Sequence, residues 1–386
     1  MPDCCIIGGG IVGLSIAREL AGRGATVRVL ARDQERSTSS WAAAGIFPPA
    51  PRHARETPGE TLTGWSDELH RRWARDLLDE TGIDNGLVTC GGLHVAGDAD
   101  RLNALDTIGA SWRDRNARCE LLTAAGVTEV EPGLADAVRR GVIVGGIYLP
   151  EETQIRTPRH LEAVRRSCEN RGVAIMDGSD VTAIRVTDGQ INGIEVTTAS
   201  GNRETVHADA YCLAAGAWSG DLAAQVDLTL ETKPVRGQIA LLRFPRPVLT
   251  RVINMGIDYL QPRPDGRLLV GSTLEDAGFD GSTTAAAIKR LREVATTLLG
   301  DISAASLEQV WAGLRPGSSD GLPSIGRLPG CRNGFVAAGH FRAGLHQSTG
   351  TAVLIADLIT GVEPTIDLAA FAPDRPRTTR DPLMPP

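Results

Sequence analysis

The chain has 386 residues, of which 42% are hydrophobic and 23% are charged, and its formal net charge is −7 with a pI of about 5.6. This composition is typical of a globular enzyme with two domains, and the negative charge argues against nucleic acid as a partner. No run of about eighteen apolar residues is free of glycine or charge, so we expect no membrane-spanning helix.

The seven cysteines are odd in number and form no C-x-x-C pair. This pattern predicts reduced thiols rather than a disulfide framework or a zinc site, and we expect no metal. No basic leader with a cleavage site precedes the first apolar segment, so we expect a cytoplasmic protein.

A nucleotide-binding pattern opens the chain. Residues 4–7 form a continuous apolar run, which predicts a buried parallel strand. Gly8, Gly10 and Gly13 follow with the spacing G-x-G-x-x-G, and apolar residues then recur at helical spacing. Residues 25–30 are rich in β-branched side chains, as in a second strand. Together these segments predict a dinucleotide-binding strand–helix–strand unit.

Each part of the glycine turn has an expected role. Gly10 lets the start of the helix approach a pyrophosphate, and Gly13 lets the helix pack closely against the sheet. The N–H groups of Ile11 and Val12 are expected to face the phosphates, assisted by the helix dipole.

The end of the second strand departs from this pattern. An acid is expected there to bind a ribose hydroxyl, but Ala31 and Arg32 occupy the place. Either Asp33 or Glu35 takes over if the strand end bends, or backbone groups and water suffice. Arg32 also leaves open a 2′-phosphate, and therefore NADP, as the ligand.

The later elements are predicted in chain order. Residues 65–79 and 157–171 are expected to be helices, and residues 180–186, 191–198 and 204–216 three strands of a meander. Strand-like runs follow at 238–244, 259–263, 267–272 and 334–338, and a last helix at 349–359. The Pro- and Arg-rich residues 373–386 are expected to form a mobile tail.

Several separated blocks resemble the D-amino-acid oxidase family of FAD enzymes, and within it the glycine oxidases. The blocks are "IIGGGIVGLSIARELAGRG", "SSWAAAGIFPP", "LAAGAWSG", "PVRGQ", "WAGLRPGSSDGLPSIG" and "AAGHFRAG". The resemblance covers nearly the whole chain. It implies an α/β (α+β) fold, with a Rossmann-like FAD-binding domain carrying a β-meander and an inserted, mainly antiparallel β substrate domain.

The resemblance also implies domain boundaries and a cofactor. We expect residues 1–85, 145–222 and 310–372 to form a discontinuous FAD-binding domain, and residues 86–144 and 223–309 to form the substrate-binding domain. FAD is expected to bind non-covalently.

The family pattern assigns FAD contacts residue by residue. Ser39 and Ser40 are expected near the phosphates, Ala44, Gly45 and Ile46 beside the isoalloxazine, and Val181 at the adenine. Ala215 and Gly216 of the "LAAGAWSG" block complete this part of the site. The alternatives left open are a solvated turn for the two serines and an ordinary strand core for Val181.

A turn before the last helix is expected to contact the flavin. The family assigns this contact to His340, Phe341, Arg342, Ala343, Gly344, Leu345 and His346. Free N–H groups and the helix dipole would stabilise the negative charge that develops at the N1–C2=O edge on reduction. An ordinary strand–turn–helix remains the alternative.

The family pattern also places the substrate-binding side chains. Arg315 matches the arginine that holds the substrate carboxylate, and an arginine suits this task because its planar fork bonds a carboxylate bidentately. Tyr259 matches the tyrosine whose hydroxyl assists, and Arg342 matches a second residue at the pocket wall. A surface ion pair, a half-buried strand tyrosine and a turn-pinning arginine are the respective alternatives.

Part of the flavin turn departs from the family. His346, Gln347 and Thr349 stand where relatives are mostly apolar or have proline, and Ala343 replaces a common asparagine. The polar groups either touch the flavin pyrimidine and tune substrate choice, or satisfy donors at the helix start.

The resemblance implies oxidative deamination of glycine or a similar small amine. Hydride passes from Cα to flavin N5, the imine hydrolyses to a 2-oxo acid and ammonia, and O2 is reduced to H2O2. A role in thiamine biosynthesis and a homo-oligomer are both compatible with the family. Three alternatives remain: a D-amino-acid or sarcosine dehydrogenase that reduces a quinone, a flavin subunit of a hydrogen-cyanide-synthase-like complex, and an NAD-dependent dehydrogenase.

Overall fold

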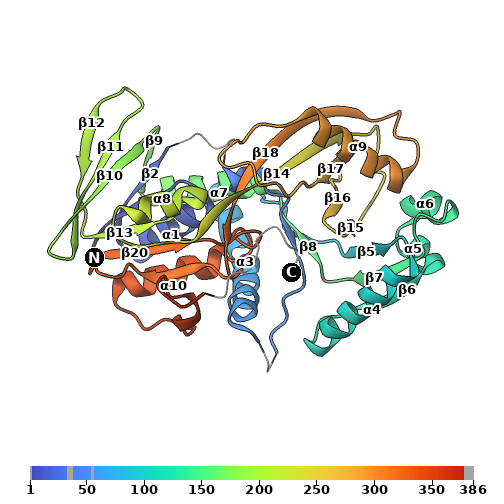
Figure 1. The fold of residues 1–386 in the computed structure, drawn as a ribbon, viewed down its shortest axis with the longest axis horizontal. Coiled ribbons are helices and arrows are strands. Elements are labelled where there is room, and N and C mark those ends of the chain that lie inside the picture. The colour runs from blue at the N-terminus through green and yellow to red at the C-terminus, as the bar shows by residue number, and fades with distance from the viewer. Residues whose placement is uncertain (1, 33–37, 54–55, 378–386) are drawn as a thin grey trace.

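The computed structural model describes residues 2–32, 38–53 and 56–377. Two large β-sheets lie beside each other along the long axis of the molecule (Figure 1). One is mainly parallel and the other mainly antiparallel, so the predicted mixed α/β fold class is confirmed. No helix among these described ranges combines the length and apolar character needed to cross a bilayer.

The first sheet has six strands in the order β19-β20-β13-β1-β2-β9. Their bounds are Ser324–Arg327, Gly334–Ala338, Ala210–Leu213, Asp3–Ile7, Thr26–Ala31 and Ala174–Asp177. All neighbours are parallel except β19 and β20. β1 lies centrally, and α1 (Ile11–Gly22) leads from it to β2 on one side, whereas β13 lies on the other. A ligand site is expected where the carboxyl ends of such strands diverge.

Both faces of this sheet are covered, and successive side chains of β1 point to opposite faces. Cys4 and Ile6 join one core with α1, α7 (Thr157–Asn170) and α10 (Ser348–Thr360). Cys5 and Ile7 join another with α8 (Ser219–Ala224) and the antiparallel meander. The meander strands are β10 (Asp180–Thr187), β11 (Gln190–Thr197) and β12 (Arg203–Val206).

The second sheet has eight strands in the order β18-β14-β17-β16-β15-β5-β7-β6. Their bounds are Ser306–Ser318, Thr232–Arg243, Arg267–Gly271, Asp258–Pro262, Val252–Met255, Gly92–Ala96, Gly145–Leu149 and Glu120–Thr123. One face packs on α9 (Ala285–Leu299), where Leu242 and Leu291 share a core. The opposite face carries Ile239, Tyr259 and Trp311. The helices therefore leave one face of this sheet available for a site.

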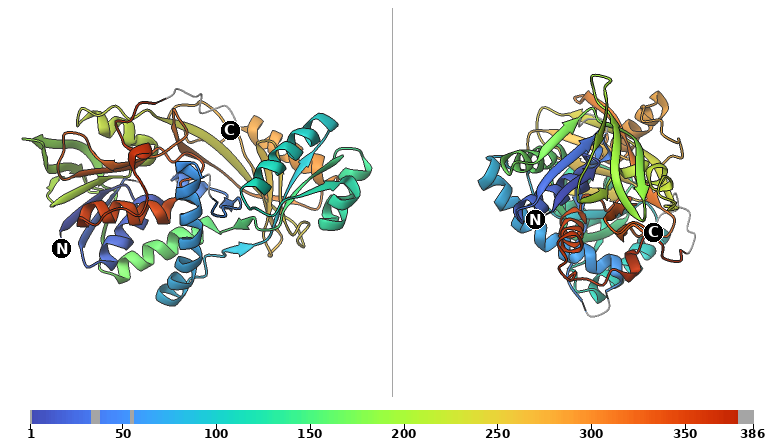
Figure 2. Two further views of the ribbon diagram at one scale, coloured as in Figure 1. Left: turned by 90° about the horizontal axis from the view of Figure 1, so that it is seen from below. Right: turned by 90° about the vertical axis from the view of Figure 1, so that its left-hand side faces the viewer.

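Smaller elements join the two halves. A three-stranded sheet has the order β3-β8-β4, with bounds Ile46–Phe47, Thr153–Gln154 and Val88–Thr89. The remaining helices are α2 (Ser39–Ala42), α3 (Pro58–Thr81), α4 (Ala99–Asp114), α5 (Ala124–Val130) and α6 (Ala135–Arg139). In the left-hand view of Figure 2, α3 crosses the middle of the molecule, and α4, α5 and α6 lie at the end opposite the N-terminus. Short 3-10 helices span Pro132–Leu134, Gly216–Trp218 and Ala369–Phe371.

The structure confirms the predicted elements with two differences. The run at 204–216 is not one strand, because it divides into β12 of the meander and β13 of the six-stranded sheet. The first residues of the predicted tail are not free, because Arg375 pairs with Asp320 at 2.8 Å and is 7% exposed in its side chain.

Two predicted domain boundaries do not follow the sheets. The boundary at residue 145 falls at the start of β7, which pairs with β5 in the eight-stranded sheet. The boundary at residue 310 falls inside β18, which pairs with β14 along its length. The pairing partners of both strands are distant in sequence, so local patterns do not assign them to a sheet.

Candidate active site

One cavity of about 1180 Å3 lies between the two large sheets. It is larger than the pockets that hold drug-sized ligands, which reach about 1,000 Å3. The predicted site residues that line it are Gly8, Gly10, Ile11, Val12, Ala31, Arg32, Ser39, Ser40, Ala44, Gly45, Ile46, Val181, Ala215, Gly216, Tyr259, Arg315, His340, Phe341, Arg342, Ala343, Gly344, Leu345 and His346. Segments far apart in sequence therefore meet around one space of dinucleotide size.

Gly13 is the predicted cofactor residue that does not line this cavity. A Cβ atom at Gly13 would lie 2.0 Å from the carbonyl oxygen of Gly8. Gly8 has a φ of 125°, and a Cβ atom there would lie 2.2 Å from the carbonyl oxygen of Ala214. These glycines let α1 pack against the ends of β1 and β13, so Gly13 is a packing residue, as its place in the motif indicates.

The amides at the start of α1 are not all directed at a ligand. The N–H of Ile11 donates to Ser40 Oγ at 2.9 Å, so the prediction that it faces a phosphate is not met in this structure. Within the described residues, the N–H groups of Gly10 and Val12 have no hydrogen-bond partner. They remain as donors at the positive end of the helix dipole, which suits an anionic group.

The end of β2 shows what stands in place of the expected acid. Ala31 is buried, and its methyl group lies beside Gly9. A Cβ atom added at Gly9 would lie only 2.6 Å from the Cβ atom of Ala31. Arg32 lies over the ring of Trp218, 4.1 Å from its centroid. The candidates Asp33 and Glu35 lie outside the described residues.

We expect Ala31→Glu to tighten FAD binding about tenfold. The new carboxylate would accept a hydrogen bond from the adenosine ribose, and such a bond contributes about 1–2 kcal/mol. The measurement is titration of FAD-stripped protein with FAD, followed by flavin fluorescence. An unchanged dissociation constant would show that the absent acid does not limit FAD affinity.

The loop before β3 is bonded by Arg263, which directly follows β16 of the eight-stranded sheet. The buried guanidinium of Arg263 donates to Gln154 Oε1 at 3.0 Å and to the Ala44 carbonyl at 3.4 Å. Burial lowers the pKa of Arg263 to about 10. Gly45 has a φ of 79° and its carbonyl accepts from the Ile155 N–H at 2.8 Å. The loop therefore has a fixed backbone along the cavity.

The turn between β20 and α10 forms the opposite wall. Phe341 adopts a φ of 49°, uncommon for a bulky residue, and its N–H donates to the Pro316 carbonyl at 2.9 Å. Among the described residues, the N–H groups of Gly344, Leu345 and His346 have no partner. Unpaired donors at the positive end of α10 favour negative charge in the cavity.

The polar side chains of this turn bond α3. His346 Nε2 lies 3.2 Å from an oxygen of Asp67, and the imidazole stacks on Phe47 with ring centroids 4.2 Å apart. Gln347 Nε2 donates to Thr63 Oγ1, and Thr349 Oγ1 donates to the Ser66 carbonyl. Within the described residues, neither side chain satisfies a donor at the start of α10, so the predicted alternative at the helix start is not what the structure shows; Gln347 and Thr349 instead connect the turn to α3. His346 also lines the cavity, so its expected contact with the flavin stays a proposal.

Two buried imidazoles hold the same turn. His70 donates from Nε2 to the carbonyls of Leu345 and His346, at 3.0 Å each. His340 lies 3.1 Å from Thr351 Oγ1. Burial lowers the pKa of both His70 and His340 to about 4, so the imidazoles are neutral at pH 7.

This burial predicts acid sensitivity. In the unfolded chain each histidine titrates near pH 6.5, so between about pH 6.5 and 4 the unfolded state binds more protons than the folded state. The free energy of unfolding should therefore fall on acidification, by up to about 1.4 kcal/mol per pH unit for each histidine. Urea unfolding at pH 7 and pH 5 measures this loss.

A pair of variants isolates the contribution of His70. His70→Gln should show a smaller loss of stability between pH 7 and pH 5 than the unsubstituted protein. His207→Gln, at an exposed histidine, should retain the full loss. Equal pH dependence in all three proteins would contradict the assignment.

Three side chains define the substrate end of the cavity. The guanidinium of Arg315 donates to Ser272 Oγ at 2.8 Å and to the Thr273 carbonyl at 3.2 Å. Within the described ranges, neither Arg315 nor Arg342 forms an ion pair. Burial lowers the pKa of Arg315 to about 10 and raises that of Tyr259 to about 12. An enclosed cation without a counter-ion beside a neutral phenol is a receptor for an anion.

Sequence reasoning missed the residues that make room for these side chains. A Cβ atom at Gly237 would lie 2.1 Å from Arg315 Nη1, and one at Gly271 would lie 2.2 Å from the hydroxyl of Tyr259. Ser272, which bonds Arg315, also lines the cavity. The "PVRGQ" block contains Gly237 and was the available signal, but the sequence alone does not show which of its residues share a sheet face with Arg315.

The donors and glycines fit FAD. Two sets of unpaired amides lie at the N-termini of α1 and α10, and the fixed backbone at Ala44 and Gly45 runs between the two sheets. A Rossmann-type sheet and an enclosed arginine that forms no ion pair among the described residues meet at the same cavity, which is the arrangement of a dinucleotide-dependent enzyme with room for a small anionic ligand.

Comparison with known proteins specifies this class. The chain belongs to the family of FAD-dependent oxidoreductases named DAO, whose model matches residues 3–358. The chain is 34% identical to the glycine oxidase of Pseudomonas aeruginosa, over 95% of this chain and 97% of that protein. It is 32% identical to the bifunctional protein ThiO/ThiG of a Nostoc species, over 92% of this chain and 52% of that longer protein.

The solved structures agree with the sequence relatives. The crystal structure of glycine oxidase from Geobacillus kaustophilus superposes with a TM-score of 0.89 at 32% identity, and the match covers 98% of this chain and 99% of that chain. The family expectation from the sequence is thereby confirmed. FAD is the cofactor that this family implies.

Proposed function

We propose that this protein is an FAD-dependent oxidase of a small amino acid, glycine or a similar amine. The observation that carries the proposal is Arg315, an enclosed guanidinium that bonds two neutral oxygens and has no carboxylate partner among the described residues. Such a group binds the carboxylate of a substrate strongly because the charge is otherwise uncompensated. The glycine oxidase relatives support the same substrate class.

The chain's own residues orient the substrate. Arg315 bonds the carboxylate, and the neutral hydroxyl of Tyr259 donates a further hydrogen bond to it. Arg342, on the wall of the same cavity, adds a second positive charge. Holding the carboxylate orients Cα in the cavity.

The cavity wall supports charge transfer. When bound, FAD supplies the acceptor for the hydride that leaves Cα. The unpaired N–H groups of Gly344, Leu345 and His346 favour the negative charge that accompanies reduction. The amino acid reacts as the neutral amine, so loss of hydride from Cα gives a protonated imine that water hydrolyses to a 2-oxo acid and ammonium. These steps need no general base from the protein.

The remaining assignments complete the proposal. O2 reoxidises the cofactor and yields H2O2, the protein works in the cytoplasm, and copies associate into a homo-oligomer. A contribution to thiamine biosynthesis is supported by the likeness to a ThiO/ThiG protein.

A peroxide assay with a panel of amines tests the proposal. Glycine, sarcosine and small D-amino acids are offered to the purified protein, and peroxide from glycine or another small amino acid is the expected result. Reduction of a dye without peroxide would instead indicate a dehydrogenase that passes electrons to a quinone. Inactivity of the isolated chain, with activity restored by co-purifying partners, would indicate a subunit of a larger complex.

A further inference from the structure

The "PVRGQ" block has a position that the proposed function does not yet explain. It lies on β14, which pairs with β18 so that Val235 is opposite Arg315. Side chains alternate along a strand, so Gly237 shares the face of Arg315 whereas Arg236 and Gln238 point to the opposite face. The absent side chain at Gly237 gives the Arg315 guanidinium its space.

A segment after β17 connects the two faces. Residues 272–284, which we name the strap, run from the end of β17 to the residue before α9. Both protein hydrogen bonds of the Arg315 guanidinium go to the first two strap residues, Ser272 Oγ at 2.8 Å and the Thr273 carbonyl at 3.2 Å. The orientation of Arg315 therefore depends on where the strap lies.

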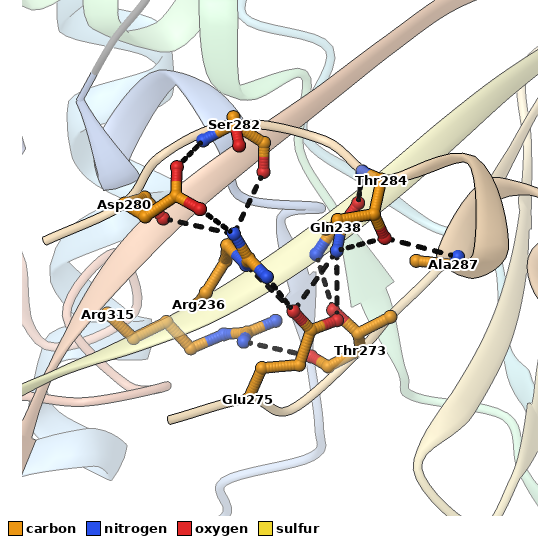
Figure 3. Close-up of polar contacts among 9 residues, drawn as sticks. All are labelled: Arg236, Gln238, Thr273, Glu275, Asp280, Ser282, Thr284, Ala287 and Arg315. Atoms are coloured by element: carbon orange, nitrogen blue, oxygen red, sulfur yellow. Dashed lines mark hydrogen bonds and ion pairs between the residues drawn. The ribbon is translucent and has the colours of Figure 1, made fainter. Parts of the chain in front are cut away.

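Arg236 holds the strap through charge. Its backbone N–H donates to the Glu275 carbonyl at 2.9 Å, and its Nε donates to the Glu275 carboxylate at 2.7 Å. Nη1 bonds Asp280 Oδ2 at 2.5 Å (Figure 3). Arg236 is only 8% exposed, whereas the side chains of Glu275 and Asp280 are 27% and 54% exposed, so the pair with Glu275 is better shielded from water than the pair with Asp280.

Gln238 holds the strap through hydrogen bonds of its backbone and its side-chain amide. Its N–H donates to Thr273 Oγ1 at 2.9 Å, and its Nε2 donates to Glu275 Oε1 at 2.9 Å. Its Oε1 accepts from the Thr284 N–H at 2.7 Å, immediately before α9 (Figure 3). Gln238 is completely buried, and both ends of its amide are paired.

Hydrogen bonds lower the pKa of both Glu275 and Asp280 of the strap, so these two acids are ionised. Partial burial opposes ionisation of Glu275, but hydrogen bonds from Thr273, Arg236 and Gln238 outweigh it and lower the pKa of the carboxyl. Glu275 and Asp280 thus both form ion pairs with Arg236. Their negative charges do not pair with Arg315, which keeps its charge for a ligand.

We propose that Arg236 and Gln238 are positioning residues for substrate binding: they clamp the strap so that Ser272 and Thr273 hold the Arg315 guanidinium ready for a carboxylate. The inference rests on the proposed function, because it assumes that Arg315 binds the substrate. Neither residue touches the substrate, so the clamp determines carboxylate affinity more than the chemical step.

Variants of the holoenzyme separate this role from a general effect on folding. Arg236→Met removes both ion pairs, and Glu275→Gln weakens one of them with little change in shape. Arg267→Met is the matched control, because Arg267 lies on β17 of the same sheet and also bonds two carboxylates, Asp265 and Glu308. Acetate is the carboxylate probe and methylamine the probe without a carboxylate, both followed by the change in flavin absorbance.

Arg236→Met should weaken acetate binding and raise KM for glycine at least tenfold, with kcat changed less than threefold. Glu275→Gln should weaken acetate binding and raise KM for glycine about threefold, with a smaller change in kcat. Methylamine affinity in both variants, and every parameter of Arg267→Met, should stay within twofold of the unsubstituted protein.

Unchanged acetate affinity in Glu275→Gln and in any folded form of Arg236→Met would overturn the inference. Equal losses for acetate and methylamine would also overturn it, because they indicate a general structural role. If the unsubstituted holoenzyme itself binds no acetate, the proposed function fails together with the inference, so the two failures are distinguishable.

Discussion

Replacing Arg315 with alanine is expected to lower kcat/KM for the amino acid substrate by about a hundredfold or more. Removing one partner of an enclosed charge pair costs about 2–5 kcal/mol, and each 1.4 kcal/mol corresponds to a factor of ten. The loss should appear mainly in KM, because Arg315 bonds the carboxylate rather than the reacting atoms. Steady-state kinetics and anaerobic bleaching of the flavin by glycine measure it.

Two further variants make this result specific. Arg315→Lys keeps the charge but loses the planar fork, so its activity should fall between those of the alanine variant and the unsubstituted protein. Arg267→Ala, which removes a more accessible arginine of the same sheet, should leave KM unchanged. If the Arg315→Ala variant bleaches at ordinary glycine concentrations, Arg315 does not hold the carboxylate.

Adding one methyl group next to the Arg315 guanidinium, with Gly237→Ala, should also weaken substrate binding. A Cβ atom at Gly237 would lie 2.1, 2.3 and 2.4 Å from Nη1, Nη2 and Cζ of Arg315. The guanidinium is the far end of a flexible side chain, so Gly237→Ala should displace it without unfolding the sheet. We expect KM for glycine to rise at least tenfold while the melting temperature changes by only a few degrees.

A second glycine provides the control. Gly126, in α5, would place a new Cβ atom at ordinary contact distance, 3.4 Å from the nearest atom of Leu122. Gly126→Ala should therefore alter neither KM nor FAD binding. Unchanged KM in Gly237→Ala would mean that the guanidinium does not occupy the observed position when the substrate binds.

The two ends of the cofactor cavity were predictable from sequence because each is a local strand–turn–helix pattern. The glycine motif before α1 and the block before α10 each contain their own turn and helix start within a few residues. The roles of Arg315 and Tyr259 came from family resemblance. Nothing in their local spacing indicates a carboxylate receptor.

The hydrogen bonds and side-chain packing that complete the site depend on contacts between segments that are distant in sequence. Ile11 donates to Ser40 and not to a ligand because α2 is brought to the start of α1 by tertiary packing. Gly237 and Arg315 meet only through the register of β14 with β18. Neither register nor strand face follows from a single sequence when the partners are about eighty residues apart.

The absorbance spectrum of the purified protein before and after anaerobic addition of glycine tests the central claim most directly. If FAD lies in the cavity beside Arg315, the protein shows the visible bands of oxidised flavin, and glycine or a similar small amino acid bleaches them. A colourless protein that takes up no added FAD, or a flavin spectrum that no small amino acid bleaches, would contradict the account.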